Sequence, residues 1–266
     1  IASEADPENL MPVMLQGYLE FLEVYVSEDP RQFEHFAAKQ QLRIRELGMG
    51  ERENPYTLFA QAESHLHLTL LSLRFQDLIG TIKQLKRSYK LHHKNNKRFP
   101  DFLPSKKSVA VLDIILGSIP DQYKLGMSLL NLQGDLEHGV STLDSLSKLS
   151  SDEFIFHHET VLTVAMLRFH LLRQHEEAIA LLNSFMIPRK GFLLDYYITA
   201  HITIHSGKVQ EAKRILDNRP KSESYISFPY MFFLEGLTSM YLNLPDATEN
   251  FMLFIDKTQG QTNIKA

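Results

Sequence analysis

The sequence contains neither cysteine nor tryptophan among its 266 residues. The absence of cysteine excludes disulfides, thiolate zinc sites, iron–sulfur clusters and cysteine nucleophiles. A large excess of positive charge is also missing, because the formal net charge is −4 and the sequence pI is about 6.3. Proteins dedicated to nucleic-acid binding are expected to be basic, so the overall composition makes a nucleic-acid partner an unfavoured hypothesis.

Long apolar runs are absent as well. The most apolar stretch, 10–26, is interrupted by Pro12, Gln16, Gly17, Glu20 and Glu23, whereas a membrane span needs about 20 predominantly apolar residues. We interpret this stretch as a buried helix and predict no transmembrane segment. Its apolar residues surround the helix almost completely, which predicts that a preceding helix or a partner covers it. Together with a first residue that is not methionine, this leads us to expect a longer protein.

Sequence motifs of catalysis are missing too. The chain has no phosphate-binding Gly-rich loop followed by Lys-Ser/Thr, no Gly-x-Ser-x-Gly, no His-Glu-x-x-His and no EF-hand loop. The best metal-ligand pair is His201 and His205, which share a helix face, but two imidazoles leave a zinc site incomplete. We therefore predict no enzymatic activity and nominate no catalytic, cofactor or metal residues.

Apolar residues instead recur at the three- and four-residue spacing of helices, and strand-like alternation is lacking, which predicts an all-α fold. Glycines and prolines divide the pattern at intervals of about one helix. The expected helices are 11–27, 30–47, 55–73, 75–93, 105–117, 120–132, 135–148, 152–172, 175–186, 192–205, 209–218, 224–241 and 245–256.

A turn-plus-helix phrase repeats in the second half of the chain. Ala178 and Ala212 are 34 residues apart and Ala247 follows after another 35; each has a large apolar residue four positions later. The small residue lets two helices approach and the large one fills the next turn of the same face. Gly139 begins a further copy, and a weaker copy ends at Ile79. Helical-hairpin arrays of longer period are the alternative explanation.

The 34-residue period and the small residue before a large one resemble the tetratricopeptide repeat family, best over 123–254. The match is degenerate, since Tyr196 and Ala200 fit the first-helix pattern but no tryptophan is present. The resemblance implies a right-handed superhelix of antiparallel helix pairs. The segment from Asn54 to Lys124 also resembles uncharacterised tetratricopeptide-like proteins of Bacteroidetes bacteria, which implies a bacterial origin and favours a periplasmic or exported location over the cytoplasm.

The expected organisation is a single helical-repeat domain over 1–266. It begins with an N-terminal helix pair (1–53), followed by a basic helix pair with an inserted loop and a short helix (54–122). Tetratricopeptide-like repeats (123–258) and a polar tail (259–266) complete it. Stacked helix pairs form long surfaces suited to peptides or partner helices.

Positive charge is concentrated at 83–107, where nine lysines and arginines face only Asp101, a net charge of +8. Lys83, Arg87, Lys90 and Lys94 follow one another at spacings of four, three and four, which places them in one stripe on a helix. Such a stripe suits a nucleic-acid backbone, an anionic membrane or an acidic protein segment. Two simpler interpretations exist. The stripe is either a solvated helix face, or it pairs within the chain with an acidic N-terminal region, which consists of Glu4, Asp6, Glu8, Glu20, Glu23, Glu28, Asp29 and Glu34.

The proline-stiffened loop after this helix carries Phe99 and Phe102, which either meet a partner or pack beneath the loop. The leading functional hypothesis is a non-catalytic protein-interaction scaffold that binds a protein or peptide, and the alternative is polyanion binding through 83–107. The candidate partner-binding residues are Lys83, Lys86, Arg87, Lys90, Lys94, Lys97, Arg98, Phe99 and Phe102.

Overall fold

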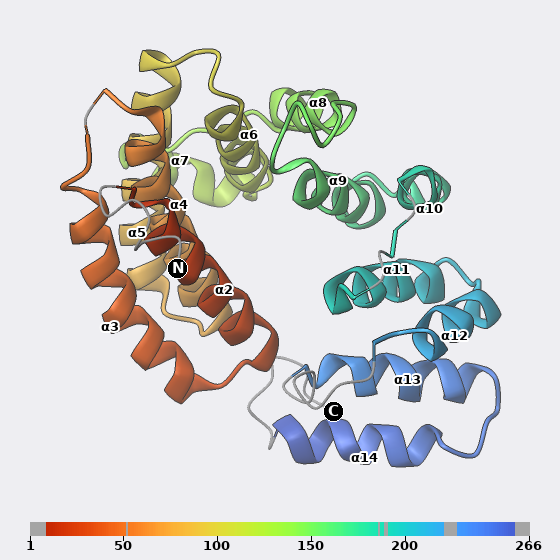
Figure 1. Cartoon of the computed structure of the whole chain (residues 1–266). Coiled ribbons are helices and arrows are strands. Elements are labelled where there is room, and N and C mark those ends of the chain that lie inside the picture. The colour runs from red at the N-terminus through yellow and green to blue at the C-terminus, as the bar shows by residue number, and fades with distance from the viewer. Residues whose placement is uncertain (1–8, 52, 186, 189–190, 221–227, 259–266) are drawn as a thin grey trace. The chain divides into compact units, whose positions relative to one another are not determined.

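The computed structural model describes residues 9–51, 53–185, 187–188, 191–220 and 228–258, without the side chains of Tyr123 and Leu125. Within these ranges all thirteen regular elements are α-helices and there is no strand, which confirms the all-α prediction. No helix in this part of the chain is both long and apolar enough to cross a membrane. The chain divides into two compact units, 1–154 and 155–266, which are described separately (Figure 1). The single domain over 1–266 stays a prediction.

The first unit holds seven helices within its described residues. They are α2 (Met11–Ser27), α3 (Pro30–Leu47), α4 (Pro55–Arg74), α5 (Leu78–Arg98), α6 (Leu103–Gly117), α7 (Asp121–Leu129) and α8 (Leu136–Ser147). Helix α4 is central: α2 and α3 pack on it from one side and α5 packs along it, while α6 joins α5 to α8 (Figure 1). An apolar cluster that includes Phe21, Phe36 and Leu68 joins α2, α3 and α4. A second cluster, which includes Leu66, Leu85 and Leu112, joins α4, α5 and α6.

Local sequence explains where these helices begin. The side chains of Asp29, Asn54, Asp77 and Asp135 each accept a hydrogen bond from a backbone N–H in the first turn of α3, α4, α5 and α8. Proline follows at the first position of α3 and α4, where its missing N–H costs nothing. The predicted starts of these two helices, at Pro30 and Pro55, are confirmed.

The second unit holds six helices within its described residues: α9 (His157–His170), α10 (His175–Ser184), α11 (Leu193–His205), α12 (Val209–Asp217), α13 (Tyr230–Tyr241) and α14 (Ala247–Thr258). They form three successive packed pairs, α9 with α10, α11 with α12 and α13 with α14 (Figure 1). The first part of the predicted helix 224–241 and the predicted tail 259–266 lie outside the described residues.

One terminating motif recurs between successive helices. Gln76, Asn131, Gly207 and Asn243 have positive φ angles of 61°, 56°, 79° and 56°. In each case the next N–H donates to a carbonyl five residues earlier, at 2.8–3.0 Å. This left-handed residue with its backward hydrogen bond is the Schellman motif, which ends a helix and satisfies its last carbonyls. The turns at Gly207 and Asn243 lie in two of the copies of the repeated phrase.

Two of the three repeated alanines lie where the helices of a pair meet, whereas the third, Ala247, is half-buried. Ala178 and Ala212 are fully buried, and so are Leu182 and Leu216 four positions later. Gly139 is buried against α6, with Leu143 one turn further on. The weaker copy is different, because Ile79 is exposed: the side of α5 that faces α4 and α6 carries Gln84, Leu85 and Ser88 instead. A β-branched residue is too bulky for the close contact that alanine or glycine permits.

The expected short helix after the loop proves to be an internal element. Helix α6 is 15 residues long, and ten of its residues are buried. Val109 and Leu112 are among them, and the helix packs against both α5 and α8. The helix is buried on more than one side because nearly every residue of 109–116 is apolar, which leaves it little polar surface to expose to solvent.

Candidate binding surface on helix α5

Helix α5 has a polar inner face that fixes its position. His65 Nδ1 of α4 lies 2.8 Å from Gln84 Oε1 of α5. Near the other end, the Asn95 amide donates to the Pro55 carbonyl and to Ser105 Oγ, both at 2.8 Å. Because these polar groups are buried, a shift or rotation of α5 would leave them unpaired. The outer face of the helix is therefore held in a defined orientation.

A buried ionic cluster lies beneath the same helix. Glu63 Oε1 of α4 is 3.2 Å from His92 Nε2 of α5 and also accepts a hydrogen bond from the Ser108 hydroxyl of α6. Glu63 Oε2 is 3.9 Å from His67 Nε2 and 4.0 Å from Lys107 Nζ. Burial alone would raise the pKa of the Glu63 carboxyl, but Lys107 and His92 hold it far below its usual range. The cluster thus joins three helices through one carboxylate.

This cluster was not predicted from the sequence, and it removes one cation from the expected basic surface. Lys107 is buried against Glu63 and does not contribute to the exposed stripe. Ser108 bonds to Glu63 and not to a histidine, so the group lacks the serine–histidine contact of a nucleophilic site. The sequence does contain an indication of this cluster. Glu63 and His67 are four residues apart on one predicted helix, and Lys107 lies near the start of another predicted helix that is mostly apolar.

The predicted basic stripe is exposed on the opposite side of α5. Lys83, Lys86, Arg87, Lys90, Lys94 and Lys97 are all exposed. Among the described residues, none of these six cations lies within ion-pair distance of a carboxylate. Arg98 differs because it pairs with Glu53 and lies 5.4 Å from the centre of the Phe99 ring. The structure therefore brings six of the seven predicted cations together as an open positive surface.

Three apolar side chains extend this surface at the N-terminal end of α5. Leu78, Ile79 and Ile82 are 65%, 84% and 42% exposed. Ile79 heads the stripe itself, since 79, 83, 86, 90, 94 and 97 follow at spacings of three or four residues. Sequence analysis missed these residues because apolar side chains in a helical pattern normally face a core. We call Ile79, Ile82, Lys83, Lys86, Lys90, Lys94 and Lys97 the α5 outer face.

The two candidate phenylalanines do not belong to this face. Phe102 is half-buried, with its ring edge-to-face at 4.8 Å from Tyr56 and 5.7 Å from Phe59. Phe99 is half-buried as well. Of the two interpretations of the loop, packing beneath it holds for Phe102, because two rings of α4 provide it with an apolar site. Phe102 is therefore part of the packing of the first unit and not of the α5 outer face.

The described acidic residues of the N-terminal region form their ion pairs with cations outside the stripe. Glu20 Oε1 lies 2.6 Å from both Lys39 Nζ and Arg43 Nη2 of α3. Glu28 pairs with Arg74 at the end of α4. Glu4, Asp6 and Glu8 lie outside the described residues. Within the described part, the interpretation of this region as the internal partner of the stripe is therefore wrong.

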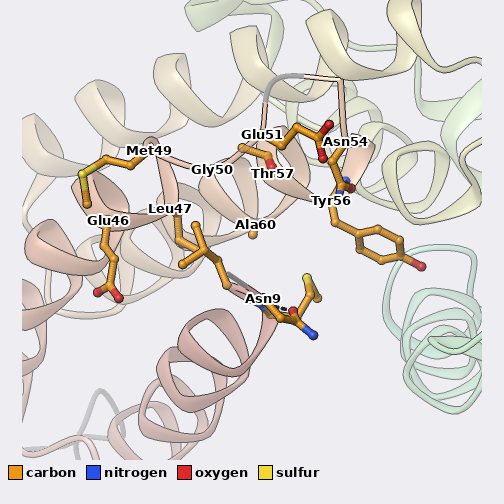
Figure 2. A pocket seen from close by; sticks show the side chains of 12 residues that line it. Asn9, Glu46, Leu47, Met49, Gly50, Glu51, Asn54, Tyr56, Thr57 and Ala60 are labelled. Atoms are coloured by element: carbon orange, nitrogen blue, oxygen red, sulfur yellow. Dashed lines mark hydrogen bonds between the residues drawn. The ribbon is translucent and has the colours of Figure 1, made fainter. Parts of the chain in front are cut away.

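A cavity of about 840 Å³ opens in the first unit between the start of α2, the end of α3 and the start of α4 (Figure 2). Its two carboxylates, Glu46 and Glu51, do not point toward one another, and Leu47 and Ala60 lie between them in the view of Figure 2. Small-molecule sites have polar groups that converge on a ligand. This cavity lacks that convergence, and we assign it no ligand.

The histidine pair in the second unit lies beside a third imidazole. The His201 ring is 4.6 Å from that of His205 and 5.2 Å from that of His170. Burial, reinforced by these two neighbours, lowers the pKa of His201 to about 4. In the described ranges, no three histidine or acidic side chains are placed to hold a metal ion. The cluster contributes titratable groups to the helix packing.

No protein-family model matches the chain, and neither does any curated protein sequence. The functional argument therefore depends on the residues of the chain itself. The feature that departs most from an ordinary solvated helix is the α5 outer face, because no described carboxylate pairs with its cations and its apolar end is exposed. Contiguous apolar groups at a surface commonly mark an interaction site.

Proposed function

We propose that the chain is a protein-binding scaffold in which packed helix pairs present a rigid surface to a protein or peptide partner. The observation that carries the proposal is the α5 outer face, where Ile79 is 84% exposed at the head of a row of lysines that pair with no described carboxylate. Exposed apolar groups next to charges are typical of the core and rim of a protein interface. The buried contacts of Gln84 and Asn95 keep this face preorganised, which reduces the entropy lost on binding.

The finer architecture is part of the same proposal. Three successive helix pairs, the repeated Schellman turns and the buried Ala178 and Ala212 support an array of the tetratricopeptide type with a right-handed superhelical path. Proteins of this architecture commonly serve as binding scaffolds, which is an argument by analogy of fold. The argument from the α5 outer face does not depend on it.

The test is retention of proteins from an extract of the cells that make this protein. Immobilised full-length chain should retain one or a few proteins at about 150 mM salt. Retention should survive nuclease treatment and disappear when the extract is digested with protease. Retention of nothing by a folded bait, or of material that nuclease removes, would contradict the proposal.

A second candidate function is binding of a polyanion along the stripe. Six exposed cations that pair with no carboxylate of the described residues favour it. It predicts binding to heparin or duplex DNA that weakens steeply as salt rises, and loss of most of that affinity when Lys86, Arg87 and Lys90 are reversed to glutamate. Tyr89, the only aromatic side chain within the stripe, is half-buried against the His93 ring at 4.1 Å, which disfavours base stacking.

A further inference from the structure

The α5 outer face has a direction, because its apolar and charged parts are at different ends. Ile79 and Ile82 occupy the first turns of α5, and the lysines from Lys83 to Lys97 follow without an interruption by an acidic residue. At a rise of 1.5 Å per residue the charged part is about 21 Å long. A complementary ligand needs an apolar group at one end and negative charges distributed over the next 20 Å or so.

The chain itself does not supply that complement in the residues the structure describes. Glu53 is the carboxylate that reaches the basic end of α5, and it pairs with Arg98. Glu20 and Glu28 pair with cations of α3 and α4. The exposed lysines therefore keep their full attraction for an external anion, which is strongest at low salt.

Three kinds of ligand carry distributed negative charge, and the apolar end separates them. A nucleic-acid backbone offers no apolar group for Ile79 and Ile82. A helix lying on an anionic membrane needs an apolar face along its whole length, whereas the exposed large apolar residues of α5 lie only in its first turns. A helix of an acidic protein can carry apolar side chains in one turn and carboxylates in the following turns of the same face, at the same three- and four-residue spacing.

We propose that the α5 outer face is the docking site for an acidic amphipathic helix of a partner protein, with an apolar anchor at Ile79 and Ile82 and carboxylates along Lys83–Lys97. This inference rests on the proposed scaffold function and names the location and chemistry of its partner. The anchor provides affinity through buried apolar area, and the charges set the register and accelerate encounter.

The test uses three synthetic helical peptides of 21 residues, the length of α5. All carry glutamates at alternating spacings of three and four; one has leucines in its first turn, one has them in its last turn, and one has glutamine in their place. Fluorescence anisotropy measures their binding to the full-length protein at about 50 and 300 mM salt. The two leucine positions cover both orientations of the docked helix.

One of the two leucine peptides should bind about tenfold tighter than the glutamine peptide. Ile79→Ser should abolish that difference, and the double variant Lys86→Glu, Lys90→Glu should weaken all three peptides about tenfold at low salt. Leu42→Ser on α3 and Lys148→Glu after α8 change an exposed apolar and an exposed basic residue elsewhere on the unit and should leave binding unchanged. All variants must show the circular dichroism and thermal unfolding of the parent protein.

Equal binding of the three peptides would overturn the proposal, as would tighter binding of duplex DNA or of vesicles that contain phosphatidylglycerol. Failure of the docking site differs from failure of the scaffold function. If extract proteins are retained equally by the parent chain and by the Ile79→Ser and Lys86→Glu, Lys90→Glu variants, the scaffold function stands and the α5 site is refuted. If no extract protein is retained, the scaffold function itself is refuted.

Discussion

Gly139 of α8 lies directly against the backbone of Ala110 in α6. A Cβ atom at position 139 would be 2.6 Å from the Ala110 carbonyl oxygen and 2.7 Å from Ile114 Cγ1. The first of these neighbours is backbone within a helix and cannot move away cheaply. The contact between α6 and α8 therefore depends on the absence of a side chain at 139.

Gly139→Ala should consequently destabilise the first unit by about 2 kcal/mol, because overpacking forces the two helices apart. Gly126→Ala on α7 is the matched control, since nothing lies within 4 Å of a Cβ there. That control should be neutral or stabilising by up to about 1 kcal/mol through helix propensity. Urea denaturation followed by circular dichroism measures both, and equal effects of the two substitutions would refute the close contact.

Removal of the buried carboxylate should be costly. Glu63→Gln leaves the Lys107 ammonium buried without its counter-charge, for which we expect a loss of about 3 kcal/mol in the free energy of unfolding. The double variant Glu63→Gln, Lys107→Met removes both charges and should recover a large part of that loss. A double-mutant cycle that shows simple additivity would mean that the two groups do not interact.

Acid should destabilise the second unit through His201. Its folded-state pKa is about 4, below the ordinary value of 6.5, so between these two values the unfolded chain binds a proton that the folded chain does not. The contribution of this residue to the free energy of unfolding therefore falls by about 3 kcal/mol as the pH drops from about 6.5 to 4, and it is flat below that window.

Substitution of His201 by phenylalanine isolates this contribution. His201→Phe retains an aromatic ring beside Phe169 and removes the titrating group, so it should reduce the loss between pH 6.5 and 4. His35→Phe changes an exposed histidine of the first unit and should keep the pH dependence of the parent. Urea denaturation at several pH values measures the free energy of unfolding as a function of pH. The same pH dependence in the parent and in His201→Phe would contradict the role assigned to His201.

Phe102 should matter for stability and not for binding. Phe102→Ala removes a ring packed against Tyr56 and Phe59, and we expect a loss of about 2–3 kcal/mol in the free energy of unfolding. Affinity for the acidic peptides should remain that of the parent, measured by anisotropy below the unfolding transition. Leu129→Ala, an exposed apolar residue of α7, is the control and should change neither quantity.

Local sequence was sufficient for much of the fold. The predicted ranges of α2 and α3 agree with the structure, because a proline in the first turn of each and the Asp29 cap of α3 are local signals. The predicted range of helix α5, 75–93, differs from the structure at both ends. The helix begins only at Leu78, because Gln76 adopts the left-handed conformation of a Schellman turn, and it continues to Arg98. A non-glycine residue in that conformation gives a weak signal in the sequence.

The candidate site was predictable only in part. The row of cations followed from the spacing of Lys83, Arg87, Lys90 and Lys94, which needs no tertiary information. Exposure of Ile79 and burial of Lys107 depend on how α5 and α6 are rotated about their axes. That rotation is set by contacts among α4, α5 and α6, notably those of Glu63, and a one-dimensional pattern does not contain them.

The most direct test of the central claim, that a protein partner contacts the α5 outer face, is site-specific photo-crosslinking in the cells that make the protein. A benzophenone amino acid at position 82 should form a light-dependent adduct that protease destroys and nuclease leaves intact, and Lys86→Glu with Lys90→Glu should reduce it. The same group at position 42 of α3 should form none. Equal adducts at both positions, or an adduct at 82 that nuclease removes, would contradict the account.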